Sequence, residues 1–392
     1  MARSLQPSTS KAWTVLDLFS GAGGMSYGFA CRSEFRIVGA VDKEQGKPGR
    51  GVNPGTVVHC NGTYAANIGV EPLHADLHVL DPEAYRRELG LSKGELTLLI
   101  ACAPCTGFSQ KNALNHVVDD PRNSLVRRSG VWVRELLPEF FVMENVKELL
   151  IGRHQHHYIG LRQLLEDELG YRMSARVHNL ADFGLPQNRV RALIIARRDG
   201  PVASLYRKAE RGATVRDAIG DLPPIGAGEV HPDDEQHRAP AHNGHSMERI
   251  RATPRDGGSW SDVAKTHPHL LIRSMIGKRP GSFPDIYGRM WWDRPAPTIT
   301  RECAHPGNGR YLHPEQDRMV SVREMSLLQG FPPDYVFTGP LPARYNQIGD
   351  AVPPLISDQV AELIVELKED RVPFEVLGAE VFQPELPLAL PG

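Results

Sequence analysis

The sequence lacks a long apolar run. No segment of its 392 residues approaches the ~20 consecutive apolar residues that a membrane-spanning helix requires. The N-terminal stretch MARSLQPSTSKAW also has no apolar centre of the kind that a secretory signal carries. We therefore expect a protein without a membrane partner.

Cysteine is scarce as well. The chain has five cysteines, an odd number scattered over its length, and this is not typical of a disulfide framework. Reduced thiols fit the pattern better, and they favour a cytoplasmic location.

An excess of positive charge is also missing, since the net charge is −2. The distribution of charge is more informative than this sum. Between Gln187 and Arg216 only Asp199 and Glu210 oppose many arginines and lysines, whereas acidic residues dominate after Val360. The basic region between Gln187 and Arg216 is compatible with a polyanionic partner. The alternative is a basic face that only contacts solvent.

Short apolar runs alternate with longer mixed segments in the first half of the chain. This alternation predicts β-α-β units, and therefore an α/β fold with a Rossmann-like, doubly wound sheet. We expect strands at 13–18, 36–41, 96–101 and 140–143, then a hairpin-like pair at 175–180 and 191–196. We expect helices at 24–31, 82–89, 159–169 and 354–367, the third ending at Gly170.

The composition changes in the middle of the chain. From Asp199 to about Asp293, Gly, Pro, His and Arg dominate and apolar periodicity fades, which predicts a smaller, loop-rich domain. The expected divisions are a flexible N-terminus at 1–12, a main domain at 13–198, the loop-rich domain at 199–293, a return to the main domain at 294–372 and an acidic tail at 373–392.

Glycines follow the first expected strand, in DLFSGAGGMSYG. Gly21, Gly23 and Gly24 allow a tight turn and a close approach of backbone to a ligand at a helix start. Asp42 ends the second strand about 20 residues later, where a carboxylate binds ribose hydroxyls. The loop lacks the GKS or GKT ending of an ATP-binding loop. The pattern predicts a nucleoside cofactor.

The third expected strand leads into APC and the fourth into Glu144 of VMENV. Cys102 and Cys105 form a CxxC pair, but a metal site would need further ligands, and a redox pair would begin a helix. We interpret Cys102 as a small core residue. Cys105, which Pro104 releases from the sheet, is the better nucleophile, and we expect it beside Glu144 and the cofactor.

These motifs resemble those of the bacterial cytosine-5 DNA methyltransferases, which use S-adenosylmethionine. They occur in the family's order: DLFSGAGGMSYGF, APCTGFS, DDPRNSL, ENV, QNRVR, RPAPTIT with RMVSVREMSLLQGFPPDY, and YNQIGDAVPP. Three positions depart from the family's pattern. Ala103 and Thr106 lie in the nucleophile motif and are interpreted as local packing changes, whereas Asp350 replaces an Asn at the cofactor site.

The resemblance implies methyl transfer to C5 of a cytosine that is flipped out of a specific duplex DNA sequence. Cys105 would add to C6 of the base and later leave as the C5 proton is lost. Glu144 would hold the N3/N4 edge, and Arg191, with Arg189, the O2 edge. Residues 13–198 would be the catalytic and cofactor-binding domain and 199–293 the target-recognition domain.

The resemblance also implies the binding residues. The methionine end of S-adenosylmethionine would lie among Phe19, Ser20, Gly21, Gly23, Gly24, Pro104, Asp350 and Ala351. Asp42 would bind the ribose and Asp76 the adenine amino group, with the stem of Lys43 packed on adenine. The expected DNA-binding residues are Ser109, Gln187, Arg251 and Arg255.

No metal is expected. We interpret the histidines of the two clusters, His154, His156 and His157 and then His237, His242 and His245, as solvated loop residues.

Two other functions stay open: an RNA (tRNA) cytosine-5 methyltransferase, which the long loop-rich insert disfavours, and a catalytically idle DNA-binding homologue, which the intact Cys105, Glu144, Gln187 and Arg191 disfavour. We further expect a monomer and a nucleoid-associated location in the cytoplasm. Whether a cognate restriction endonuclease is a partner in the same system stays open.

Overall fold

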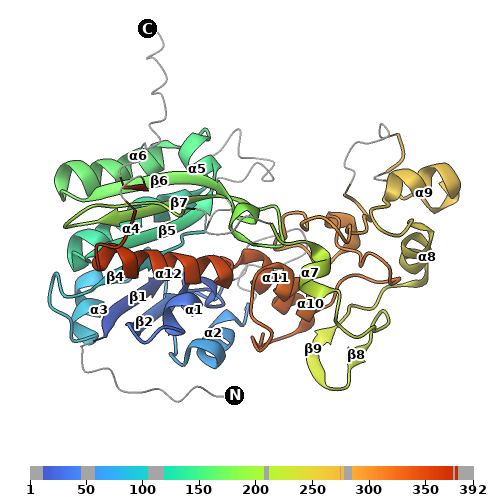
Figure 1. Ribbon diagram of the computed structural model, residues 1–392, viewed down its shortest axis with the longest axis horizontal. Coiled ribbons are helices and arrows are strands. Elements are labelled where there is room, and N and C mark those ends of the chain that lie inside the picture. The colour runs from blue at the N-terminus through green and yellow to red at the C-terminus, as the bar shows by residue number, and fades with distance from the viewer. Residues whose placement is uncertain are drawn as a thin grey trace, which may run out of the picture.

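A computed structural model describes residues 12–45, 58–104, 119–206, 212–273, 275–277, 285–373 and 376–377. Its centre is a seven-stranded sheet with the strand order β3-β2-β1-β4-β5-β7-β6 (Figure 1). The expected N-terminal segment and acidic tail lie almost wholly outside the described residues. Among the described residues, no helix is long and apolar enough to cross a membrane.

The strands are β1 (Trp13–Leu18), β2 (Phe35–Asp42), β3 (Leu73–His74), β4 (Leu98–Ala101), β5 (Phe140–Val146), β6 (Arg172–Asn179) and β7 (Val190–Arg197). The first five run parallel, and β7 is inserted antiparallel between β5 and β6. The predicted α/β class, the strand positions and the hairpin-like pair are confirmed, with a sheet that is mixed rather than wholly parallel.

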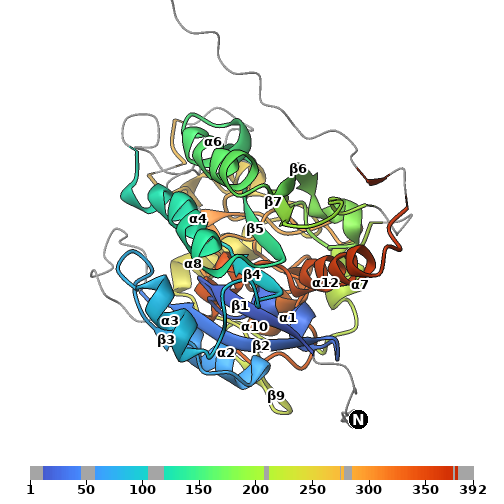
Figure 2. The same ribbon diagram turned by 90° about the vertical axis from the view of Figure 1, so that its left-hand side faces the viewer.

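Helices cover both faces of the sheet (Figure 2). They are α1 (Gly24–Ala30), α2 (Cys60–Ile68), α3 (Pro82–Glu88), α4 (Ser124–Leu136), α5 (Glu148–Ile151), α6 (His156–Gln163) and α12 (Pro354–Lys368). Leu16, Leu99 and Phe141 point into a core shared with α3, α4 and α6. The alternate residues Val15 and Leu98 point into a second core, shared with α1 and α12. Burial on both faces is why these strands are largely apolar.

The expected helix at 159–169 corresponds to α6 and a following π-helical turn, Leu164–Glu168, after which Gly170 has a positive φ of 72°. The strand expected at 140–143 is longer than predicted, because β5 pairs with β7 as far as Val146. Glu144 therefore lies within β5 rather than beyond its end.

A second lobe lies beside the sheet (Figure 1). It contains α7 (Val215–Ile219), β8 (Val230–His231), β9 (Asp234–Arg238), α8 (Gly244–Ala252), α9 (Trp260–Thr266), α10 (Val322–Leu328) and α11 (Leu341–Asp350). One apolar core joins Ile250 and Trp260 to Leu312 and Met325, and so continues across position 294. The division into domains stays a prediction.

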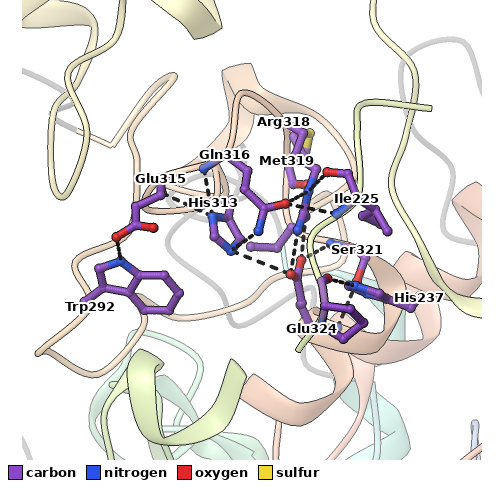
Figure 3. A network of polar contacts seen from close by, with 12 residues as sticks. Ile225, His237, Trp292, His313, Glu315, Gln316, Arg318, Met319, Ser321 and Glu324 are labelled. Carbon is purple, nitrogen blue, oxygen red and sulfur yellow. Dashed lines mark hydrogen bonds and ion pairs between the residues drawn. The ribbon is translucent and has the colours of Figure 1, made fainter. Parts of the chain in front are cut away.

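A buried ion pair organises this lobe (Figure 3). Arg318 donates to both carboxylate oxygens of Glu324 at 2.6 and 2.7 Å, and its Nε donates to the carbonyl of Ile225 at 2.9 Å. Glu324 also accepts from the backbone amide of Ser321 in the capping box that begins α10. His237 contacts the Ser321 hydroxyl at 2.8 Å and is buried, so its interpretation as a solvated loop residue is wrong.

Glycine is required where α1 packs on α12. The amide of Gly28 donates to the hydroxyl of Ser357 at 2.9 Å, and a Cβ at position 28 would lie 2.2 Å from the backbone nitrogen of Asp358. Since that atom belongs to a helix backbone, it cannot move aside without separating the two helices.

We expect Gly28→Ala to lower the free energy of unfolding by about 3 kcal/mol, the upper range for overpacking a core. Thermal unfolding followed by circular dichroism measures the effect. Gly244→Ala is the matched control, because Gly244 is an exposed helical glycine whose added Cβ would meet no described atom within 4 Å. Equal unfolding midpoints for the two variants would contradict the packing described here.

Candidate active site

A cavity of about 350 Å³ lies at the carboxyl ends of β1, β2, β4 and β5. Most of the residues predicted for the cofactor line it: Phe19, Ser20, Gly21, Gly24, Asp42, Lys43, Asp76, Pro104, Asp350 and Ala351. Glu144 lines the same cavity. Its size and its mixed apolar and polar lining are typical of small-molecule sites.

The turn between β1 and α1 forms one wall of the cavity. Phe19, Gly21 and Gly23 have positive φ values of 63°, 51° and 88°. Of the residues predicted for the cofactor, Gly23 does not line the cavity. It is the N-cap of α1, and a Cβ at this position would lie 3.0 Å from the hydroxyl of Tyr335. A Cβ on Gly24 would lie 2.1 Å from the carbonyl oxygen of Val352. The turn therefore packs against residues 350–352, which we call the closing segment, too closely for a side chain at position 24.

Asp42 is held by backbone amides. Its Oδ2 accepts from the amide of Gly21 at 3.0 Å and its Oδ1 from the amide of Glu44 at 2.6 Å. Burial raises the pKa of Asp42, and these amide hydrogen bonds oppose that rise. A carboxylate has further lone pairs for incoming hydroxyls, so Asp42 is an oriented acceptor at the cavity wall.

Asp76 is paired with Lys43, a contact that the sequence analysis did not foresee. The Lys43 Nζ lies 2.7 Å from Oδ2 of Asp76, and the amide of His78 donates to Oδ1 at 2.9 Å. Although burial acts in the opposite direction, hydrogen bonds from Lys43 and His78 lower the pKa of Asp76 to about 2. Asp76 is thus an ionised acceptor at neutral pH.

Asp17 is a cavity residue that the sequence analysis missed. It is buried, and the hydroxyl of Ser26 donates to its Oδ2 at 2.5 Å, while Tyr64 donates to that hydroxyl at 2.8 Å. The pKa of Asp17 is raised to about 7, because burial and, to a smaller extent, the charge of Asp42 outweigh the lowering effect of the Ser26 hydrogen bond. The sequence did contain a signal for this residue, since Asp17 is the acidic residue in the mostly apolar stretch WTVLDL of β1.

Glu144 and Arg191 form an ion pair at the adjoining edge. Oε1 of Glu144 lies 3.1 Å from Nε of Arg191, and both side chains are largely buried, with 12% and 13% of their surface exposed. They meet because β5 and β7 are antiparallel neighbours in which Val146 faces Arg191 and Glu144 faces Leu193. The amide of Glu144 also donates to the sulfur of Cys102 at 3.4 Å, and burial raises the pKa of that thiol. Cys102 is therefore a poor nucleophile at neutral pH.

Two predicted site residues point elsewhere. Arg189 is buried and donates to the carbonyls of Ile299 and Ala351, both at 3.0 Å. Gln187 is buried, donates to the side chain of Gln329 at 2.6 Å and accepts from the amide of Ile299. These contacts join the residues just before β7 to Ile299, Gln329 and Ala351, and neither Gln187 nor Arg189 lines the cavity.

The remaining predicted residues fall outside the cavity or outside the described chain. Cys105 and Ser109 lie outside the described residues. Arg251 and Arg255 are exposed on the second lobe, at the end of α8 and in the turn after it.

Arg301 is a second residue that the sequence analysis missed. It lines the cavity, and its Nη1 donates to Oδ2 of Asp350, which lines the cavity too. Both side chains are partly buried. The cavity therefore holds a matched cation and anion beside its closing segment, and Asp350 does not present an isolated negative charge.

Comparisons with known proteins identify the family of this chain. The pattern that defines the C-5 cytosine-specific DNA methylases matches residues 13–366. The chain is 32% identical to the type II methylase M.HgiDII of Herpetosiphon aurantiacus, over 91% of this chain and 96% of that protein. It is 33% identical to the type II methyltransferase M1.HphI of Haemophilus parahaemolyticus, over 91% and 88% of the two chains.

Solved structures share the fold. A protein described as a DNA modification methyltransferase, encoded within an Escherichia coli prophage, superposes with a TM-score of 0.64 at 24% identity, covering 91% of this chain and all of that one. The methyltransferase EhMeth of Entamoeba histolytica gives 0.60 at 14% identity, over 91% and 99%. On the family match, this chain belongs to the C-5 cytosine-specific DNA methylases and is an S-adenosylmethionine-dependent DNA (cytosine-5)-methyltransferase.

Proposed function

We propose that the cavity binds S-adenosylmethionine and that Glu144, Arg191 and Cys105 act on a cytosine flipped out of a specific duplex DNA sequence. The observation that carries this proposal is that Glu144, in its ion pair with Arg191, lines the same cavity as Asp42 and Asp76. A base held by Glu144 would lie next to a nucleoside held by the two aspartates.

The described residues fit the cofactor. Asp42, oriented by two backbone amides, would accept hydrogen bonds from the ribose hydroxyls. The ionised Asp76 would accept a hydrogen bond from the adenine amino group. The backbone of Phe19 and Gly21 approaches the methionine end. There Arg301 and Asp350 complement the carboxylate and the ammonium of the amino acid. S-adenosylmethionine, when bound, supplies a methyl group from its sulfonium.

The protein's groups activate the base. The Cys105 thiolate adds to C6, which makes C5 electron-rich and places negative charge towards N3 and O2 of the ring. Glu144 holds the N3/N4 edge and would favour protonation of N3, where this charge develops, and Arg191 holds the Glu144 carboxyl in place. Once C5 has received the methyl group, loss of the C5 proton would restore the ring and expel Cys105. Arg189 contributes by donating to the carbonyl of Ala351 in the closing segment, and Gln187 by holding Gln329, which donates to the same carbonyl.

The second lobe supplies the DNA contacts in this proposal. Arg251 and Arg255 are exposed there and suit phosphates, and Ser109 of the segment after Cys105 is a further contact. The relatives' names are those of type II methyltransferases, so we propose a cognate restriction endonuclease as a partner in the same system. We also propose a monomer that acts on chromosomal DNA in the cytoplasm, associated with the nucleoid.

Covalent trapping tests the nucleophile. In duplex DNA that carries 5-fluorocytosine at the target, the C5 substituent cannot leave as a proton, so the cysteine stays attached to C6. We expect a denaturation-resistant adduct that peptide mapping assigns to Cys105. Cys105→Ala should abolish both the adduct and turnover.

Cys102→Ala is the matched control, because the Cys102 sulfur accepts from the amide of Glu144 and the pKa of its thiol is raised by burial. It should keep most of the activity and form the adduct. An adduct on Cys102, or turnover by Cys105→Ala, would overturn the assignment.

The salt dependence of DNA binding tests the second lobe. Each lost phosphate contact should reduce the slope of log affinity against log salt concentration by about 0.9. We therefore expect the Arg251→Ala, Arg255→Ala double variant to bind less tightly and to have a slope smaller by about 1.8. The control pair is Arg36→Ala with Arg87→Ala, exposed arginines on the sheet lobe. An unchanged slope in the first pair would show that those arginines do not contact the backbone.

A further inference from the structure

A histidine cluster gathers around one carboxylate, and none of its residues lines the cavity. Asp119 stands just before the short helix η1 (Pro121–Asn123), and His156 and His157 begin α6. The Nε2 atoms of His156 and His157 lie 3.1 and 2.9 Å from the same atom, Oδ2 of Asp119. His154 lies nearby, with its Nδ1 3.7 Å from Oδ1.

These distances match the edges of a tetrahedral metal site. Zinc binds imidazole nitrogen and carboxylate oxygen at about 2.0–2.2 Å, which places neighbouring tetrahedral ligand atoms about 3.4 Å apart. Asp119, His156 and His157 each offer one ligand atom, and these three atoms lie within 4.8 Å of one another. His154 is close enough to be a fourth ligand after a small shift.

The burial of the cluster also suits a bound ion. His154 and His157 are buried, whereas 55% of the His156 side chain and 40% of that of Asp119 are exposed. An ion can therefore enter from solvent towards a partly enclosed set of donors. The side-chain Nδ2 of Asn123 donates to Oδ1 of Asp119 at 2.7 Å and orients the carboxylate, as outer hydrogen bonds do around metal ligands.

If Asp119 only stabilised a turn through a hydrogen bond, one histidine donor would be enough. Here two successive residues direct the same ring nitrogen at one oxygen, and their ring centroids are only 4.2 Å apart. Convergent nitrogen donors are what a transition metal requires. Imidazole-rich sites with one carboxylate favour zinc, cobalt or nickel over magnesium or calcium.

We propose that Asp119, His156 and His157, with His154, form a binding site for a divalent transition-metal ion of the zinc class. The bound ion joins the segment that leads into η1 and α4 to the start of α6. The interpretation of these three histidines as solvated loop residues is thereby replaced. The proposal does not depend on the roles assigned to the cavity.

Cobalt(II) is the probe, because its visible absorption reports tetrahedral coordination. Full-length, tag-free protein is stripped of metal and titrated, and we expect a tetrahedral spectrum that saturates at one equivalent and is displaced by zinc but not by magnesium. Zinc should also raise the thermal unfolding midpoint, since the ion binds the folded chain.

His156→Ala tests the ligand set, and its exposed side chain makes loss of folding a minor concern that the metal-free unfolding midpoint checks. We expect cobalt affinity to fall at least about 10-fold, since even outer partners of metal ligands are worth 10–100-fold. His245→Ala is the control, because 87% of that side chain is exposed on α8 outside the cluster.

Three results would overturn the proposal. They are the absence of a saturable cobalt spectrum, equal affinities of the His156→Ala and His245→Ala variants, and a near-ultraviolet thiolate band. The last result would mean that cysteines bind the metal.

Discussion

The contact between α1 and α12 holds the cofactor cavity together. The glycine-rich turn after β1 supplies one wall and the closing segment at 350–352 another, yet more than 320 residues separate them. They meet because Gly24 and Gly28 have no side chains where the backbone of Val352 and Asp358 approaches. Tyr335 adds a third link, since its hydroxyl donates to the carbonyl of Ala22. Without these contacts, Asp42 and Asp350 would not face one cavity.

Paired charges give that cavity its chemistry. Lys43 keeps Asp76 ionised, Arg301 balances Asp350, and Arg191 orients Glu144. Each pair places a fixed donor or acceptor where solvent is partly excluded, so that little reorganisation is needed when a ligand binds. Asp17 is the exception: it lacks a cationic partner in the contacts described, and burial raises its pKa to about 7. A second buried pair, Arg318 with Glu324, anchors the lobe that we propose reads DNA.

The sequence predicted those features that depend on neighbours in the chain. Apolar runs located β1 and β5 because buried parallel strands are apolar on both faces, and the glycine turn with Asp42 located the nucleoside end of the cavity. Partners distant in sequence could not be predicted in this way. Arg301 meets Asp350 across 49 positions and Asp119 meets His157 across 38, and only the folded chain brings them together. The contacts of Arg189 with Ala351 and of Gln187 with Gln329 span more than 140 positions, and their motif did not indicate them for the same reason.

We propose that this cavity directs a methyl group to C5 of cytosine in duplex DNA. The product is identified by mass spectrometry of nucleosides after incubation with S-adenosylmethionine carrying a deuterated methyl group, using duplex DNA and tRNA in parallel. We expect labelled 5-methylcytosine from the duplex, none from tRNA, and loss of the label with Glu144→Gln. Labelled 5-methylcytidine from tRNA, or label at another position of the base, would contradict the proposal.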